Sequence, residues 1–515
     1  MIVTLTVAAL AAPTQAELAA TSVKPEPLVE DAFEAIGLYQ ARATSTSVGT
    51  TNPLLDGQVI GTLGGSNGTT VMPEGSAEFA EQRFNAFLTW RPVALDGRAE
   101  LGAAFEVDMA FGDQSYAVGG NTGGAFGGDQ VNLQTRRLFA AFSPRIGPDA
   151  SVEIVTGLQL VTDGAHNPTG ASPDALFRSG GRLMVVGTEA AGVTAYGKVF
   201  DSFGERLRWR LGAYTLYEVA FTEPDDVWLV AADLDVEVGW RTHVGVHSWT
   251  LLDRSGGGAG VLGVGPTSAL SEMQGGPRLD LRAEGELEAP DAYTDVFWFA
   301  VDAGYDHTLS VGPIGLSGVA VVNVGRIYAG PFDRRRIAGG LVDGEARWRF
   351  APGRGSVARV EGLWTTRDDP TDPSRYGGVV TANTWGIAAA TYGTHGGLLL
   401  FPDIKAINRQ SAIVYDVSGR GEGVIAANTT VGYDVIPDRL NTTAGVAHAR
   451  NSSGVPWGTE LHGHVGFEPW WLVDVGVHGG VVLPGSRSLV SGLTTASGTS
   501  AVPWAMLLTC DWILL

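Results

Sequence analysis

The stretch RAELGAAFEVDMAF, residues 98–111, alternates between two kinds of side chain over its whole length. Leu101 and Phe105 belong to an apolar set, and Glu106 and Asp108 belong to the set between them. A period of two places these sets on opposite faces of a β-strand, whereas a helix would mix them. The stretch therefore predicts a strand with one apolar face and one polar face.

The same alternation recurs in other parts of the chain. It is clearest in four segments of 12 residues each, namely 206–217, 230–241, 278–289 and 457–468. Strands of soluble proteins average about five or six residues, whereas a tilted strand needs about nine to eleven residues to span a bilayer. The length of the segments therefore favours a membrane protein over a soluble sandwich.

Composition supports a membrane-spanning β-structure. Charged residues make up 17% of the 515 residues, against about 25% in soluble domains. No run of 18 or more apolar residues supplies a transmembrane helix, and a closed barrel is the other structure that satisfies its backbone hydrogen bonds inside lipid. We therefore expect an all-β fold, a transmembrane antiparallel β-barrel of about 18 strands (16–20) over residues 78–515, with ambiguous pairing in 394–420.

The N-terminal region indicates an exported protein. Residues 2–12 form an apolar run, and Thr14-Gln15-Ala16 resembles a cleavage site, so residues 1–16 are predicted to be a signal peptide. Residues 17–77 are predicted to form an N-terminal segment that is periplasmic, plug-like or disordered, with a short helix over 28–43. Export together with a barrel predicts the outer membrane of a Gram-negative bacterium.

Charge and cysteine content exclude several classes of protein. The formal net charge is -21, which argues against nucleic acid as a partner, because nucleic acid requires a basic surface. The single cysteine, Cys510, excludes an internal disulfide framework and a multi-cysteine metal site. No cofactor is expected, and the expected partners are outer-membrane lipid and a small solute.

Arginines and carboxylates in the predicted strands are the candidate functional residues. A cationic side chain on the lipid face costs about 2–4 kcal/mol at the bilayer midplane, so these side chains should point into the lumen. Opposed rows of charge would place a transverse field across a pore; alternatively, cross-strand ion pairs simply close the interior. The lumen candidates are Arg136, Arg208, Arg210, Arg278, Arg282, Arg347, Arg349, Glu106, Asp108, Asp233, Asp235, Glu284 and Glu286.

Other motifs favour structural interpretations. Residues 258–263 match GxGxxG but lie in a glycine-rich loop rather than between a strand and a helix. The acidic cluster at 367–372 does not follow the order of an EF-hand loop and is predicted to be solvated. Histidine pairs on one strand face can bind a metal, but no third ligand is evident, so they are predicted to line the lumen. The two pairs are His243 with His247 and His462 with His464.

Three short stretches carry a family resemblance. Residues 133–139 read LQTRRLF, residues 155–159 read VTGLQ, and Asp511-Trp512 lie near the end of the chain. Together these stretches resemble porins of the alginate-export type. The resemblance implies eighteen strands and an arginine-rich lumen, but it does not support alginate as the solute. An anionic saccharide is kept as one candidate partner. Leu158 stands where the family motif carries arginine, and the acidic chain also departs from that family.

The sequence thus predicts a passive porin for small polar or charged solutes, with no catalytic, cofactor-binding or metal-binding residues. Two alternatives remain open. One is a barrel enzyme that acts on outer-leaflet lipid or peptide, for which the four histidines named above are the best candidates. The other is a structural or adhesion barrel whose lumen is plugged by residues 17–77.

Overall fold

The fold is described from a computed structural model of the chain. The structure describes residues 32–47, 77–111, 132–144, 146–147, 149–165, 185–201, 204–217, 226–239, 241–255, 293–307, 309–328, 334–369, 371–372, 374–383, 397–401, 417–418, 421–470, 472–485 and 502–514.

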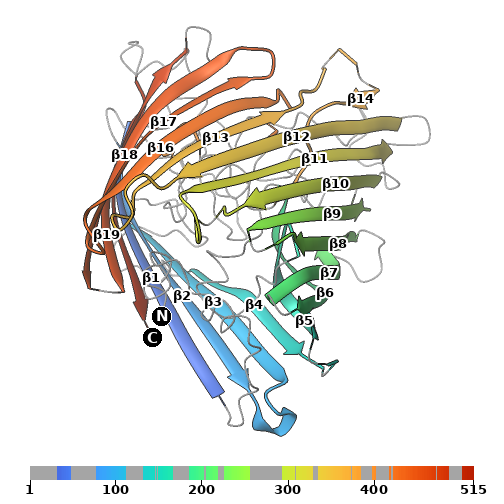
Figure 1. Ribbon diagram of the computed structural model, residues 1–515. Coiled ribbons are helices and arrows are strands. Elements are labelled where there is room, and N and C mark those ends of the chain that lie inside the picture. Colours follow the sequence, from blue (N-terminus) through green and yellow to red (C-terminus); the bar gives the residue numbers. More distant parts are fainter. Residues whose placement is uncertain are drawn as a thin grey trace.

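Within these residues, eighteen long strands form one closed antiparallel sheet. Each strand pairs with its neighbours along the chain, β13 pairs with β16, and β20 pairs with β1 to close the ring (Figure 1). The strands are β1 Ala32–Thr46, β2 Ala77–Arg91, β3 Ala99–Phe111, β4 Asn132–Phe142, β5 Ala150–Thr162, β6 Val186–Asp201, β7 Gly204–Tyr217, β8 Val227–Glu237, β9 Thr242–Asp253, β10 Tyr293–Tyr305, β11 Ile314–Tyr328, β12 Arg334–Trp348, β13 Val357–Thr365, β16 Val424–Ile436, β17 Leu440–Asn451, β18 Pro456–Trp470, β19 Val473–Pro484 and β20 Trp504–Leu514.

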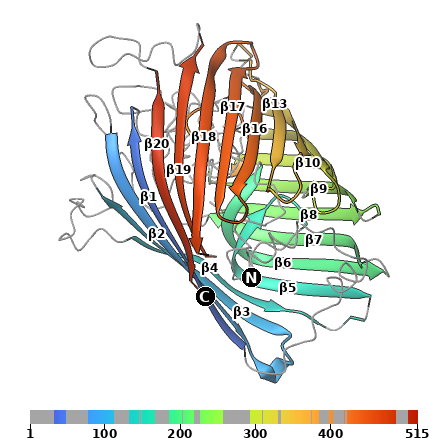
Figure 2. The ribbon, with the colours of Figure 1, turned by 60° about the vertical axis from the view of Figure 1, so that its left-hand side comes forward.

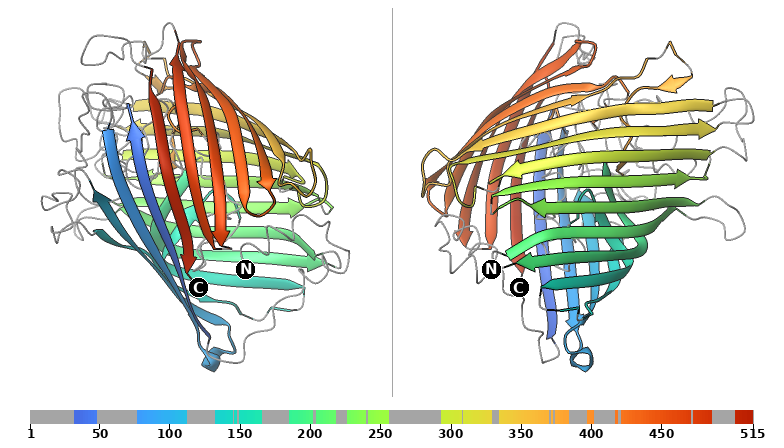
Figure 3. Two further views of the ribbon diagram at one scale, coloured as in Figure 1. Left: turned by 90° about the vertical axis from the view of Figure 1, so that its left-hand side faces the viewer. Right: turned by 45° about the vertical axis from the view of Figure 1, so that its right-hand side comes forward.

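The prediction of an antiparallel barrel of about eighteen strands is confirmed. Figure 2 shows β20 between β19 and β1, and Figure 3 shows β6–β12 stacked along one side of the wall. Closure removes the free sheet edges, which lipid cannot hydrogen-bond. Two further strands of two residues, β14 Arg375–Tyr376 and β15 Ala382–Asn383, pair in parallel with β12 and β6. Among the described residues, no helix has the length and apolar character needed to cross a membrane.

The first wall strand corrects two predictions. β1 lies within residues 17–77, so the wall includes Ala32–Thr46 and does not begin at 78, and the helix expected over 28–43 is wrong. The alternation in β1 is hard to recognise, because small residues alternate with longer ones: Gly37 precedes Leu38, and Ala41 precedes Arg42. Alanine also favours helices. The predicted signal peptide, residues 1–16, lies outside the described residues.

A second expected strand, residues 278–289, also lies outside the described residues. β9 and β10 pair directly with each other, from Thr294 opposite Asp253 to Tyr305 opposite Thr242. The pairing across the region 394–420 was ambiguous from sequence. In the structure, β13 pairs directly with β16.

The outward face of the wall is apolar. In β11, Leu316, Val322 and Val324 are 48%, 52% and 49% exposed, while Val321 and Asn323 between them are buried. Exposed tryptophans lie within three residues of strand ends, as expected for aromatic girdles at two membrane interfaces. They are Trp90, Trp348, Trp470 and Trp512 at one end of the barrel and Trp228 and Trp364 at the other.

Arginine substitutions on this face test whether a bilayer surrounds it. Val322→Arg, in the central part of β11, is expected to destabilise the barrel by about 2–4 kcal/mol, whereas Ile314→Arg at the strand end should cost about 0–1 kcal/mol. Both side chains are about equally exposed, at 52% and 50%. Urea unfolding of the protein in lipid vesicles measures both costs. Equal costs at the two positions would contradict membrane insertion.

Candidate functional site

The inward face of the wall changes character along its strands. In β8 the inward residues Val227, Leu229 and Ala231 are followed by Asp233 and Asp235. Neighbouring strands change at the same level, because their antiparallel register aligns Leu229 with Leu251 and Asp233 with His247. One half of this side of the lumen is therefore apolar, and the other half is charged.

β10 follows the same pattern. Val296, Trp298 and Ala300 are buried on its inward face, and Asp302 and then Gly304 follow. The apolar half lies toward the end of the barrel where β9 and β10 are joined by residues 254–292, and the charged half lies toward the end with the short connections β8–β9 and β10–β11.

The apolar half is covered from within the barrel. The covering piece, here called the inner segment, consists of residues 374–383 and 397–401 of the connection between β13 and β16. Val380 and Phe401 of the inner segment are buried in one apolar cluster with Leu229 and Trp298 of the wall. The Trp298 indole Nε1 donates a hydrogen bond of 2.8 Å to the Val380 carbonyl. The inner segment thus narrows the lumen on the apolar side.

A single carboxylate holds the other part of the inner segment. Glu460 of β18 is completely buried. Its oxygens accept hydrogen bonds from the backbone N–H groups of Leu398, Leu399 and Leu400, at 2.6, 3.2 and 2.7 Å. Such bonds satisfy the charge of the carboxylate and fix the backbone of 398–400 against the wall. Glu460 is thus the main polar anchor of this part.

The charged half contains a buried ion pair between β7 and β8. Arg210 Nε and Nη2 both lie 2.6 Å from Asp233 Oδ2, and both side chains are fully buried. Arg210 Nη1 donates to the carbonyl of Thr162, and Trp249 Nε1 donates to Asp233 Oδ1 at 3.0 Å. For this pair the structure supports the alternative in which cross-strand ion pairs close the interior.

The β12–β13 pair keeps its arginines accessible. Glu345 is bound by Arg347 on its own strand and by Arg359 at 3.2 Å across the pair, and the glutamate is only 4% exposed. The two arginines lie opposite each other in the register and retain 25% and 24% exposure. Arginine dominates the accessible charge here, because the nearby carboxylate of Glu361 is buried.

A third charged group lies on the side of the barrel formed by β2, β3 and β4. Glu106 lies 3.3 Å from Arg83 and 3.8 Å from Arg136, and Arg136 also contacts Glu189 at 3.1 Å. The pairing of β3 and β4 shifts register around Arg136. A bulge of this kind redirects a side chain, and Arg136 joins this group beside the buried Arg137.

The structure places most of the predicted lumen residues. Six of them lie on the inward face of the wall, either in the charged groups described above or at alternate positions of the same strands. They are Arg208, Arg210, Asp233, Asp235, Glu106 and Arg347. Arg136 belongs to the same face through its bulge. Arg349 follows the last residue of β12, and its backbone N–H bonds to the Pro313 carbonyl, so it lies in a connection rather than in a wall strand.

Five predicted residues are placed in part or not at all. The backbone of Asp108 lies opposite Arg83 in the register of β2 and β3, but the structure does not describe the Asp108 side chain. The other four lie outside the described residues: Arg278, Arg282, Glu284 and Glu286.

Several polar residues of the lumen were not among the predicted ones. Glu189 and Asp302 each fall inside long strands, so alternation could have indicated Asp302. The role of Glu460 had no local signal, because its partners at 398–400 are about 60 residues away in the chain.

The histidine pairs lie on different strands. His243 and His247 belong to β9, and His462 and His464 belong to β18. β9 pairs with β8 and β10, whereas β18 pairs with β17 and β19. The four histidines therefore do not form one group, which removes the best candidates for the enzymatic alternative.

Comparison with known proteins gives similar structures only. No family model matches the chain, and no curated protein matches its sequence. A BenF-like porin from Pseudomonas fluorescens Pf-5 is 11% identical, with 94% of this chain and 98% of that chain covered and a TM-score of 0.46. The corresponding values are 12%, 93%, 98% and 0.45 for Pseudomonas aeruginosa OpdK with vanillate, and 9%, 95%, 100% and 0.45 for Acinetobacter baumannii OccAB4. The barrel assignment rests on the strand pairing of this chain itself.

Proposed function

We propose that the protein is a passive channel of the bacterial outer membrane for small polar or charged solutes. The observation that carries this proposal is the contrast between the two faces of the wall. The outward face is apolar, whereas part of the inward face is charged, and Arg347 and Arg359 on it keep about a quarter of their side chains exposed. Charged rings and rows along a lumen are how channels select solutes. The proposal involves no cofactor and no reaction.

We further propose that the solutes carry carboxylate groups. Arg347 and Arg359 support this preference, since each keeps about a quarter of its side chain exposed and arginine binds carboxylates through two parallel hydrogen bonds. An anionic saccharide fits the same chemistry. Outer-membrane lipid is the partner proposed for the outward face.

Liposome swelling tests the proposal directly. Vesicles that contain the refolded protein should swell in isosmotic solutions of small carboxylates and small neutral sugars, with faster swelling for the carboxylates. Equal swelling for both would contradict selection by arginine. No swelling with any solute, from a barrel shown to be folded by its heat-modifiable gel mobility, would contradict the channel itself.

Removing one accessible arginine should change ion selectivity. Arg359→Gln leaves Glu345 paired with Arg347, and it should shift the reversal potential in a salt gradient toward cation selectivity. The free energy of an anion beside residue 359 is expected to rise by about 1 kcal/mol, which is the interaction energy of two unit charges about 4 Å apart in water. Arg450→Gln is the matched control, because Arg450 is exposed on β17 in alternation with buried Ala449. An equal shift in both variants would contradict a role for Arg359 in the lumen.

A further inference from the structure

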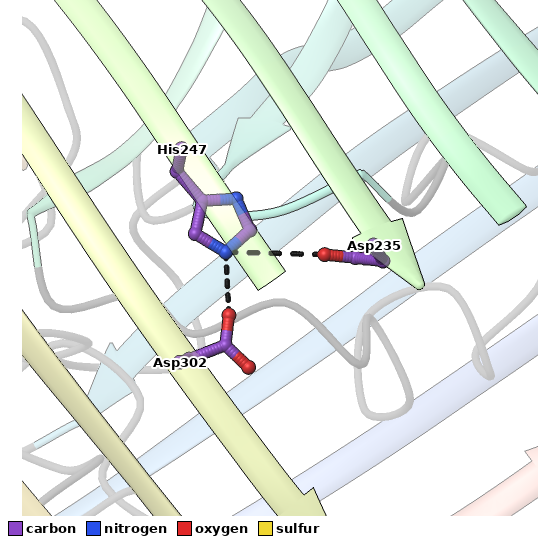
Figure 4. A group of neighbouring side chains, drawn as sticks. All are labelled: Asp235, His247 and Asp302. Carbon is purple, nitrogen blue, oxygen red and sulfur yellow. Dashed lines mark hydrogen bonds and ion pairs between the residues drawn. The ribbon is translucent and has the colours of Figure 1, made fainter. Parts of the chain in front are cut away.

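We propose that the lumen wall binds one divalent transition-metal ion of the zinc class through His247, Asp235 and Asp302. These residues come from the adjacent strands β9, β8 and β10, and their ligand atoms all lie within 4.8 Å of one another. His247 is nearly buried, while Asp235 and Asp302 are 15% and 13% exposed, so an ion in the lumen can reach the carboxylates. Figure 4 shows the three side chains converging.

The register of the sheet creates the space for an ion. Asp235 and Asp302 both lie opposite Gly245 of β9, one on each side, and His247 lies two residues further along the same face. A Cβ atom at Gly245 would lie 2.3 Å from Asp302 Oδ2, 2.5 Å from His247 Nε2 and 2.8 Å from Asp235 Oδ1. The three donor atoms therefore converge above a residue that has no side chain.

A second layer of hydrogen bonds orients the imidazole. His247 Nδ1 lies 2.9 Å from Asp233 Oδ1, and Asp233 is itself held by Arg210 and Trp249. An ionised carboxylate only accepts hydrogen bonds, so Nδ1 donates to Asp233, and Nε2 is the nitrogen that would bind an ion from the lumen. Such a carboxylate–histidine arrangement typically supports a metal-binding imidazole.

His247 Nε2 faces two carboxylate oxygens. Nε2 lies 2.5 Å from Asp302 Oδ2 and 3.9 Å from Asp235 Oδ1. Without a metal, Nε2–H donates to Asp302 Oδ2; a bound cation would take the place of that proton. One nitrogen and two oxygens match the donors that zinc prefers, with a fourth position left for water, whereas calcium takes six to eight oxygen ligands.

The donor spacing also fits a small tetrahedral ion. Metal–ligand bonds of about 2.0–2.2 Å at tetrahedral angles place donor atoms roughly 3.4 Å apart. The distances of 2.5 and 3.9 Å from Nε2 lie on either side of this value, so opposite shifts of under 1 Å would complete the site. His243 Nε2, at 3.1 Å from Asp302 Oδ1, fixes the other oxygen of that carboxylate.

A second proton on His247 is the competing state. A doubly protonated imidazole would bridge Asp233 and Asp302 without any metal. The two states differ in their response to added zinc: an ion that binds at Nε2 releases the proton of that nitrogen, whereas a His247 that stays doubly protonated binds no zinc.

Zinc titration of the refolded full chain in detergent, after removal of metal with EDTA, distinguishes these states. We expect one zinc ion per chain by calorimetry, and an absorption spectrum of tetrahedral coordination with Co²⁺. His247→Gln, Asp302→Asn and Gly245→Ala should each weaken zinc binding at least tenfold, and Asp233→Asn should weaken it by about 10–100-fold through the second layer. His448→Gln, an exposed histidine of β17, should bind zinc as the unchanged protein does.

Three results would overturn the proposal. The first is no zinc binding by a heat-modifiable, folded barrel, with both nitrogens of His247 protonated by NMR at pH 7. The second is binding that survives both His247→Gln and Gly245→Ala. The third is binding that is lost in His464→Gln alone, which would place the ion at the stacked His464–His478 pair of β18 and β19. Because conductance does not enter these tests, their failure is distinguishable from failure of the proposed channel.

Discussion

Replacing Arg210 with methionine is expected to lower the free energy of unfolding of the barrel by about 3–5 kcal/mol, because the change leaves the buried charge of Asp233 without its counter-ion. Both side chains of this pair have 0% exposure, and their atoms approach to 2.6 Å. Urea unfolding of the refolded protein, followed by tryptophan fluorescence and gel mobility, measures the loss.

Two further variants separate the buried charge from other effects. Arg210→Met combined with Asp233→Leu should recover only part of the stability, because the apolar pair removes the unpaired charge but leaves Trp249 Nε1 and His247 Nδ1 without their acceptor. Arg254→Met removes an exposed partner of Asp295, at 2.8 Å and 36% and 41% exposure, and should cost no more than about 1 kcal/mol. A loss for Arg254→Met as large as that for Arg210→Met would contradict the importance of burial.

Replacing Glu460 with leucine is expected to release residues 397–401 from the wall and to raise single-channel conductance. The change removes the acceptor of three backbone hydrogen bonds. Hydrogen bonds to charged groups contribute about 1.5–3 kcal/mol each, so a loss of about 4 kcal/mol or more would make the docked position a minor state. Limited proteolysis should then cut within 397–401, a site protected in the unchanged protein.

The matched control for Glu460 lies on the same strand. His464→Gln changes a half-buried residue four positions along β18 that faces the same side and stacks on His478 but holds none of the three backbone groups. It should leave both conductance and protease protection unchanged. If Glu460→Leu also left both unchanged, the inner segment would be held by its apolar contacts alone.

Alternation predicted most of the wall because it is a local signal. Strands such as β3, and the second half of β8, alternate between apolar residues and charged or small ones, so they can be recognised locally. β1 lacked this contrast, since Gly37, Ala41 and Ala43 occupy its outward positions. The half of each inward face that is apolar, as at Val296 and Trp298, also weakens the alternation, because both faces are then hydrophobic.

The functional contacts depend on register, and register is set by pairing across the sheet. Asp302 follows His247 by 55 residues in the chain, yet both lie beside Gly245 once β9 and β10 are aligned. Sequence alone could indicate two histidines on one face and Asp235 as a residue of the lumen, but not that Asp235 and Asp302 meet His247. The same reasoning explains why the docking of 398–400 on Glu460 was not predicted.

The central claim is that this barrel conducts solutes through a lumen whose accessible charge selects them. Single-channel recording of the refolded protein in a planar bilayer, with a salt gradient across it, tests this claim most directly. We predict discrete, steady conductance steps and a reversal potential that moves toward cation selectivity in Arg359→Gln. A folded, membrane-inserted barrel that shows no conductance steps would contradict the claim.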